Sequence, residues 1–202
     1  MNTSLKARPL LLVVLAALVA AFALAGCGPT KPGDTAAFND ADVTFVTGMI
    51  GHHQQAVVMS DWAAERASDP KVQALAKRIT AAQGPEIRTM TAWLKAWDQP
   101  VPDAYDPDAE HGGHAMEGMD MGSEGMMSAD DMATLETAKG ADFDQEFLRQ
   151  MVKHHEGAVT MSKDELKSGE NPKAKVLAKA IIAAQTAEIA EMKGLLAEKF
   201  IE

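Results

Sequence analysis

A short stretch that occurs twice holds the side chains best suited to chemistry in this chain of 202 residues. The two copies read FVTGMIGHHQQAVVM over residues 45–59 and FLRQMVKHHEGAVTM over residues 147–161. Four of the six histidines lie in them, as the adjacent pairs His52-His53 and His154-His155. Imidazole and thioether groups are ligands for soft and borderline metal ions. The stretch therefore predicts a metal site, and copper fits its donors best.

Methionine precedes each histidine pair by three positions, as Met49-x-x-His52 and Met151-x-x-His154. Residues three apart share one face of a helix. Helical-bundle metal sites use Glu-x-x-His at this spacing to hold two iron or manganese ions. Here a thioether replaces the carboxylate. Thioether sulfur favours Cu(I), whereas imidazole accepts Cu(I), Cu(II) or zinc. We expect a copper site that favours Cu(I) and also admits Cu(II).

Further candidate ligands lie at the end of each copy and on the helices expected to follow. They are Met59, Met161, Glu86, Met90, Glu188 and Met192. A glutamate that faces the inside of a bundle needs a partner. Three kinds of partner are open: the metal, the first histidine of a pair, or the neighbouring Gln83 and Gln185.

A segment between the two copies adds an independent signal. It contains His111, His114, Met116, Met119 and Met121, followed by Met126-Met127. Methionine is unusual in a Gly-rich segment of this kind, and Met/His tracts suit Cu(I), which accepts two or three ligands without a rigid cage. We expect the segment to be a flexible linker that captures metal, and the alternative is an incidental spacer.

Both residue types also have an ordinary structural explanation. A methionine at helical spacing is usually core filler, and a buried histidine is more often a hydrogen-bonded core residue than a ligand. The duplicated histidine pairs, beside methionine and glutamate, favour metal binding. The hydrophobic period points His52 and His154 inward, while His53 and His155 lie about 100° around the helix. The latter two either face a neighbouring helix, coordinate a second ion or are exposed.

Four long helices are predicted to position these groups. Apolar and candidate-ligand residues step by three and four over residues 45–63, which indicates one buried face on a helix that begins near residue 39. Asp69-Pro70 ends this helix and begins the next. The second helix spans about 71–97, and Gly84-Pro85 is expected to interrupt and kink it. Its expected inner face is Leu75, Ile79, Ala82, Glu86, Met90 and Trp93.

The second half repeats the first at a constant offset of 102 positions. A short helix that runs to Ala138 precedes it, and Ser128-x-x-Asp131 is expected to cap the start of this helix. Helices over about 142–168 and 172–199 correspond to the first two. A lone amphipathic hairpin leaves its apolar face uncovered, so two hairpins should close into an antiparallel four-helix bundle. No segment alternates with period two. The expected fold class is therefore all-α.

The N-terminal region predicts an address outside the cytoplasm. Lys6 and Arg8 precede an apolar run of 15 residues, Leu10–Leu24, which is short for a spanning helix and typical of a signal peptide. The run leads to Cys27, the only cysteine, which we expect to carry lipid after cleavage, as in a bacterial lipoprotein. A plain secretory signal is the alternative. No second cysteine exists to form a disulfide.

These signals divide the chain as follows: signal peptide 1–26, tether 27–37, first hairpin 38–98, linker 99–127, and short helix with second hairpin 128–202, with one bundle domain over 38–202. The formal net charge of −10 would become −12 without the signal peptide. An acidic chain of this kind repels nucleic acid, and we expect no nucleic-acid partner.

Several segments resemble the bacterial family called domain of unknown function 305. They are MIGHHxxAVxM from Met49, FDxxFLxxMVxHHxGAVxM from Phe143, and QxxEIxxM from Gln83 and Gln185. The likeness covers about residues 38–197. It implies a secreted or membrane-anchored ferritin-like bundle, and some members bind copper in the periplasm and act in copper tolerance. The resemblance implies copper binding by Met49, His52, His53, Met59 and their counterparts Met151, His154, His155 and Met161.

One departure from the family pattern is Gly84-Pro85, which would shift Glu86 relative to Glu188 and make the two halves bind metal unequally. Taken together, the sequence predicts a membrane-anchored, extracytoplasmic copper-binding protein for sequestration, tolerance or delivery, and not an enzyme. A copper-transfer partner or a homo-oligomer is open. The rival hypotheses are a ferritin-like oxidase of Cu(I) or Fe(II) and a structural or partner-binding bundle without metal.

Overall fold

The computed structural model describes residues 36–105 and 124–198, and this part of the chain contains five helices and no strand. The helices are α1 (Asp40–Arg66), α2 (Pro70–Ala96), α3 (Ala129–Thr137), α4 (Gly140–Ser168) and α5 (Pro172–Glu198). The all-α prediction is confirmed. Cys27, the signal peptide and the five linker residues His111, His114, Met116, Met119 and Met121 lie outside the described residues. None of the described helices has the length and apolar character needed to cross a bilayer.

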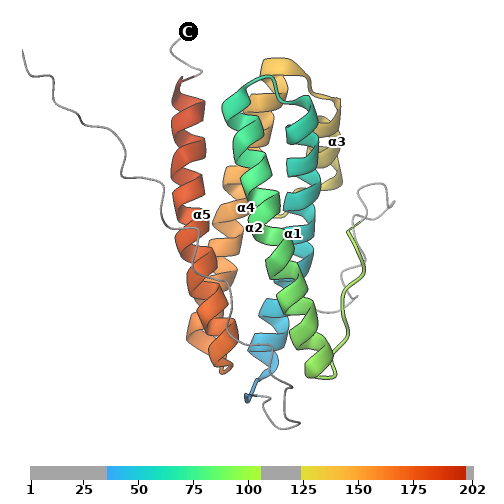
Figure 1. Cartoon of the computed structure of the whole chain (residues 1–202), viewed down its shortest axis with the longest axis vertical. Coiled ribbons are helices and arrows are strands. Elements are labelled where there is room, and N and C mark those ends of the chain that lie inside the picture. Colours follow the sequence, from blue (N-terminus) through green and yellow to red (C-terminus); the bar gives the residue numbers. More distant parts are fainter. Residues whose placement is uncertain (1–35, 106–123, 199–202) are drawn as a thin grey trace, which may run out of the picture. The chain divides into compact units, whose positions relative to one another are not determined.

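The four long helices lie side by side as a bundle (Figure 1). Helix α1 packs along α2, α4 packs along α5, and the two hairpins meet where α1 packs against α4. Exposed ion pairs join α2 to α5 in antiparallel register, from Lys71 to Glu198 at 2.6 Å and from Arg78 to Glu191 at 2.6 Å. The short helix α3 packs on α4 and α1. The predicted four-helix bundle is confirmed.

Side chains cap the starts of α1 and α3. Asn39 and Ser128 each form a capping box, with Asp42 and Asp131 respectively, so that side chains satisfy backbone N–H groups that have no partner within the helix. Ser128 was the predicted cap of the short helix, and that prediction is confirmed.

Two aspartates tie the two repeats to each other. Asp42 on α1 accepts hydrogen bonds from the backbone N–H groups of Glu170 at 3.0 Å and Asn171 at 2.8 Å, in the turn between α4 and α5. Asp144, its counterpart 102 positions later, accepts from the backbone N–H groups of Ser68 and Asp69 at 2.9 and 3.0 Å, in the turn between α1 and α2. Each hairpin therefore caps the turn of the other, which fixes how they dock.

The buried apolar residues form two separate clusters along the bundle, which we call cluster A and cluster B. On α1, cluster B holds residues between 45 and 50, and cluster A holds residues between 56 and 63. The other long helices are divided in the same way, with polar residues between the two groups. The bundle therefore has an apolar half on either side of a polar layer, and both repeats contribute to each half.

Two predictions for the second helix are wrong. Helix α2 continues from Pro70 to Ala96 through Pro85, so Gly84-Pro85 does not interrupt it. Ala82 is exposed, and Gln83 is buried in its place with 3% exposure. At the level of the polar layer, the inner face of α2 is therefore shifted by one residue from the predicted one, and it presents a polar side chain there.

Candidate metal centre

The polar layer is built from equivalent residues of the two repeats, and we call it the histidine layer. It consists of His52 and His53 on α1, Gln83 and Glu86 on α2, His154 and His155 on α4, and Gln185 and Glu188 on α5. All four histidines are at most 1% exposed. Four buried imidazoles in the middle of a bundle core are costly unless their polar atoms have partners.

The second histidine of each pair bonds to a glutamate of the neighbouring helix. His53 Nε2 lies 2.7 Å from Glu86 Oε2, and His155 Nε2 lies 2.9 Å from Glu188 Oε2. A carboxylate only accepts, so the Nε2–H group donates, and in the neutral ring the lone pair is on Nδ1. The same carboxylate–imidazole arrangement orients metal-binding histidines in many proteins.

These two hydrogen bonds decide points that the sequence left open. The glutamates pair with His53 and His155, and not with His52 and His154 or the glutamines. The second histidines face a neighbouring helix and are as buried as the first. Because the two bonds are alike, Pro85 does not displace Glu86 relative to Glu188, contrary to the expectation from the family pattern.

The first histidines meet at the contact between the two repeats. The ring centroids of His52 and His154 are 3.7 Å apart, with their planes inclined by 44°. His52 Nε2 lies 3.2 Å from the backbone carbonyl oxygen of Glu124. Neither ring nitrogen of His154 has a hydrogen-bond partner in good geometry, although the backbone of His52 lies close enough to favour the protonated ring. An ion therefore has room only at the ring edges, where the nitrogens are, and not between the ring faces.

Five imidazole nitrogens of the layer are buried without a hydrogen-bond partner. They are Nδ1 of His52, His53, His154 and His155, and Nε2 of His154. A buried polar atom without a partner lowers stability by about 1–3 kcal/mol. Ligation of a metal would satisfy such nitrogens, so the layer fits an imidazole-bound ion.

Burial keeps the central histidines neutral. It lowers the pKa of His52 from 6.5 to about 3, and the neighbouring His53 adds to this effect. It also lowers the pKa of His154 well below the ordinary value, again with a contribution from neighbouring imidazoles. A neutral ring offers a lone pair to a metal, whereas a protonated ring does not. At pH 7 these two rings are therefore ready to bind an ion without first losing a proton.

Thioether groups lie in both apolar halves next to the layer. Cluster A contains Met59, Met151 and Met192, and cluster B contains their counterparts Met161, Met49 and Met90. All except Met161, which is partly buried, are 0% exposed. Met127 and Met132 add two more methionines to cluster A only. The soft donors are thus distributed on both sides of the histidines, with an excess in cluster A.

No preformed cage exists among the described residues: nowhere do three or more His, Cys, Asp or Glu side chains converge on one point. A site in the layer therefore needs methionine sulfur as well as imidazole, or a small movement of the rings. Cu(I) suits this condition because it accepts two or three soft ligands. Iron and manganese suit it less, since the two carboxylates of the layer already bond to histidines.

The sequence named Gln83 and Gln185 only as possible partners of Glu86 and Glu188, and the structure buries both at 3% exposure with an Oε1 that has no partner. Two other groups of the site were not predicted. Gln55 bonds to the backbone of Met127, and Glu124 offers its carbonyl to His52. Backbone carbonyls and the return path of a linker leave no pattern in the sequence.

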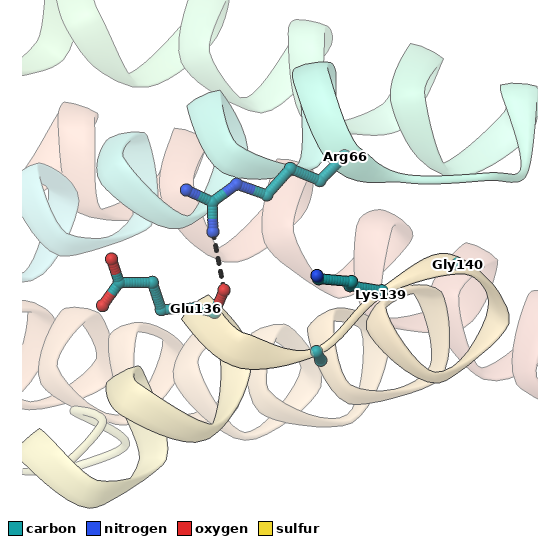
Figure 2. Close-up of a pocket in the computed structure, with 5 residues that line it drawn as sticks. Arg66, Glu136, Lys139 and Gly140 are labelled. Atoms are coloured by element: carbon teal, nitrogen blue, oxygen red, sulfur yellow. Dashed lines mark hydrogen bonds between the residues drawn. The ribbon is translucent and has the colours of Figure 1, made fainter.

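A surface pocket of about 400 Å³ lies elsewhere, where α1 ends and α4 begins (Figure 2). It is lined by Arg66, Glu136, Ala138, Lys139 and Gly140. The Arg66 guanidinium donates to the Glu136 carbonyl oxygen at 2.8 Å. None of the predicted metal ligands among the described residues lines this pocket, so it has no part in the histidine layer.

Known proteins match this chain over most of the bundle. The family model described as "Domain of unknown function (DUF305)" matches residues 42–196. A solved DUF305 structure from Streptomyces coelicolor, of a protein inferred to be secreted, is 34% identical, with a TM-score of 0.67 over 78% of this chain and 93% of that chain. A DUF305 fragment from Deinococcus radiodurans is 32% identical, with a TM-score of 0.66 over 79% and 97%.

The protein CopM is similar to the same degree. Its Cu(II)-bound form is 35% identical, with a TM-score of 0.63 over 78% of this chain and 96% of that chain. CopM has also been solved in Cu(I)-bound and Ag-bound forms. Among curated proteins, an uncharacterised protein, L153, of Acanthamoeba polyphaga mimivirus is 42% identical over 60 residues, which is 39% of its length and 30% of this chain.

Proposed function

The chain belongs to the DUF305 family, and we propose that it binds copper in the histidine layer, with Cu(I) as the favoured form. The observation that carries the proposal is the set of five buried imidazole nitrogens without partners, flanked by methionines of both clusters. Such a layer lowers the stability of the empty protein, and ligation of an ion is the chemistry that would remove this penalty. The copper- and silver-bound forms of CopM support the choice of metal.

The ligands we propose are imidazole nitrogens and thioether sulfurs of both repeats. His52 and His154 would bind through the edges of their contacting rings, together with methionines such as Met49 and Met151. His53 and His155 would bind through Nδ1, because their Nε2–H groups are held by Glu86 and Glu188. In this arrangement the two carboxylates orient and polarise ligands and do not bind the ion themselves.

We further propose that the protein handles copper outside the cytoplasm, for sequestration, tolerance or delivery. The secreted character inferred for the Streptomyces coelicolor relative and the signal-like first 26 residues support this location. Lipid on Cys27 and additional capture by the segment His111–Met121 belong to the same proposal. Thioether groups need no deprotonation, so capture by methionine would persist in mild acid.

Binding without turnover is part of the proposal. A ferritin-like oxidase would hold its ion with an open position for oxygen, and would consume oxygen continuously when Cu(I) or Fe(II) is supplied. A binding protein would stop after its sites are filled. Oxygen uptake measured during metal addition distinguishes the two, because a catalyst continues beyond stoichiometric loading.

Metal analysis after titration with Cu(I), Cu(II) and Zn(II) tests the proposal. The matched sample is a variant that lacks residues 111–121, so that metal bound by the bundle is counted without the linker. We expect the variant to retain Cu(I) that resists removal by a weak chelator. Complete loss of Cu(I) in this variant would refute a site in the histidine layer, while the linker could still bind metal.

A further inference from the structure

A short backbone segment lies against the histidine layer on one side, and we call residues Glu124–Met127 the strap. The Glu124 carbonyl oxygen lies 3.2 Å from His52 Nε2. Met127 is 6% exposed and belongs to cluster A. The strap is therefore the only described part of the region between α2 and α3 that hydrogen-bonds to a histidine of the layer.

Gln55 holds the strap with both ends of its amide. Its Nε2 donates to the Met127 carbonyl at 3.0 Å, and its Oε1 accepts from the Met127 N–H at 2.8 Å. The same Nε2 also donates to the Tyr105 hydroxyl at 3.0 Å. Gln55 is 1% exposed, so these bonds are shielded from water, and their loss would leave buried polar atoms without partners.

Gly157, which occupies the position equivalent to Gln55 in the second repeat, makes room for the strap. A Cβ atom at this position would overlap the carbonyl oxygen of Glu124 and lie 2.8 Å from the Cα of Gly125. Gly125 has a φ of +79° and passes close to the backbone of α4. The two repeats thus differ at one equivalent position in a way that seats the strap: Gln55 binds it, and Gly157 leaves space for it.

The hydrogen bond to Glu124 determines which nitrogen of His52 can bind a metal. A carbonyl oxygen only accepts, so His52 Nε2 carries the proton and Nδ1 carries the lone pair. Nδ1 of His52 is buried without a partner. His154, which has no such partner on either nitrogen, is not fixed in this way.

We propose that the docked strap is a positioning element for copper: through the Glu124 carbonyl it holds His52 in the tautomer and orientation that ligate through Nδ1. Docking of the strap and binding of Cu(I) then stabilise each other. Because coupling between two binding events is reciprocal, Cu(I) must tighten the strap by the same factor by which the strap tightens Cu(I). This inference rests on the proposed copper function.

Gly157→Ala tests the inference, with Gly51→Ala as the matched control. Both glycines lie inside helices of the repeated stretch, and alanine favours a helix over glycine by about 1 kcal/mol at both. A Cβ at Gly51 meets nothing within 4 Å, whereas one at Gly157 displaces the strap. Loss of an outer partner of a metal-binding histidine lowers affinity by about 10–100-fold. We expect a loss in this range for Gly157→Ala and wild-type Cu(I) affinity for Gly51→Ala.

Two further readouts separate positioning from general loosening of the fold. Ring-nitrogen NMR of the metal-free protein should show the Nε2–H tautomer of His52 in the wild type and in Gly51→Ala, and a mixture of tautomers in Gly157→Ala. Hydrogen exchange of the Met127 N–H should slow when Cu(I) binds to the wild type. It should be fast in Gly157→Ala with and without the metal.

The outcomes distinguish failure of the inference from failure of the proposed function. If the wild type does not bind Cu(I), the proposed function is wrong. If the wild type binds Cu(I) and Gly157→Ala binds it equally while its Met127 N–H exchanges rapidly, the strap has no positioning role. Faster Met127 exchange on Cu(I) loading would also overturn the inference, because it would show that the metal displaces the strap.

Discussion

Replacing His154 with leucine should make the metal-free protein more stable. Both ring nitrogens of His154 are buried, and neither has a hydrogen-bond partner in good geometry, although the backbone of His52 lies close by. Leucine has a similar volume and no polar atom, so it fills the position without the penalty. A residue that lowers stability in the empty protein is typical of functional sites, where stability and function compete.

The size of the effect follows from the contacts of the ring. Relieving a buried polar group without a partner is worth about 1–3 kcal/mol. Loss of the ring contact with His52, whose centroid is 3.7 Å away, removes about 0.5–1.5 kcal/mol. The expected net gain in the free energy of unfolding is about 1 kcal/mol, or an increase in Tm of roughly 2–4 °C for a chain of this size.

Urea unfolding at pH 7 with a copper chelator present measures this gain. His52→Leu is the matched control, because it deprives the Glu124 carbonyl of its donor and should therefore gain less or lose stability. With Cu(I) added, the wild type should become more stable than His154→Leu, since only a protein that binds the ion is stabilised by it. A His154→Leu protein that is less stable than the wild type by more than about 1 kcal/mol without metal would refute the reasoning.

Three other predictions follow from single contacts. Acid should destabilise the metal-free protein as pH falls from 6.5 towards 3, because burial lowers the pKa of His52 to about 3 and the unfolded chain then binds a proton that the folded chain does not. Urea unfolding at each pH should show a loss of up to about 5 kcal/mol in the free energy of unfolding over this window, and a smaller loss in His52→Leu. Glu188→Gln should weaken Cu(I) binding about tenfold or more in a chelator competition, while Glu191→Gln, on the exposed side of α5, should leave it unchanged. Asp144→Ala should lower the free energy of unfolding by about 2–3 kcal/mol, because it leaves backbone donors of the α1–α2 turn without their acceptor. The side chain of Asp142 is exposed, so the control Asp142→Ala should change the free energy of unfolding by less than about 0.5 kcal/mol.

The fold could be predicted from the sequence because several independent signals indicated the same helices. The step of three and four along the repeated stretch, the prolines that begin α2 and α5, and the Ser128 cap all predicted helices at the observed places. The constant offset then implied two equivalent hairpins. Pro85 misled the prediction because a proline inside a helix removes one hydrogen bond, and the packing of α2 along α1 is sufficient to keep the helix continuous.

Only part of the site could be predicted from the sequence. The first histidine of each pair lies on the apolar period, so its burial could be predicted, and the structure agrees. The second histidine lies off that period and is nevertheless buried, with its Nε2 paired to Glu86 or Glu188 of the next helix. That pairing depends on how the helices are rotated about their axes, which the spacing within one helix does not determine. The Glu124 carbonyl is a backbone group and carries no residue signature at all.

X-ray absorption spectroscopy of the Cu(I)-loaded bundle tests the central claim most directly. The sample is the variant without residues 111–121, loaded with one equivalent of Cu(I), so that the signal comes from the histidine layer. We predict a coordination shell with both nitrogen and sulfur neighbours, in which the nitrogen contribution falls when His52 and His154 are both changed to leucine. A shell of sulfur alone or oxygen alone, or a shell unchanged by the double substitution, would contradict copper binding by the histidine layer.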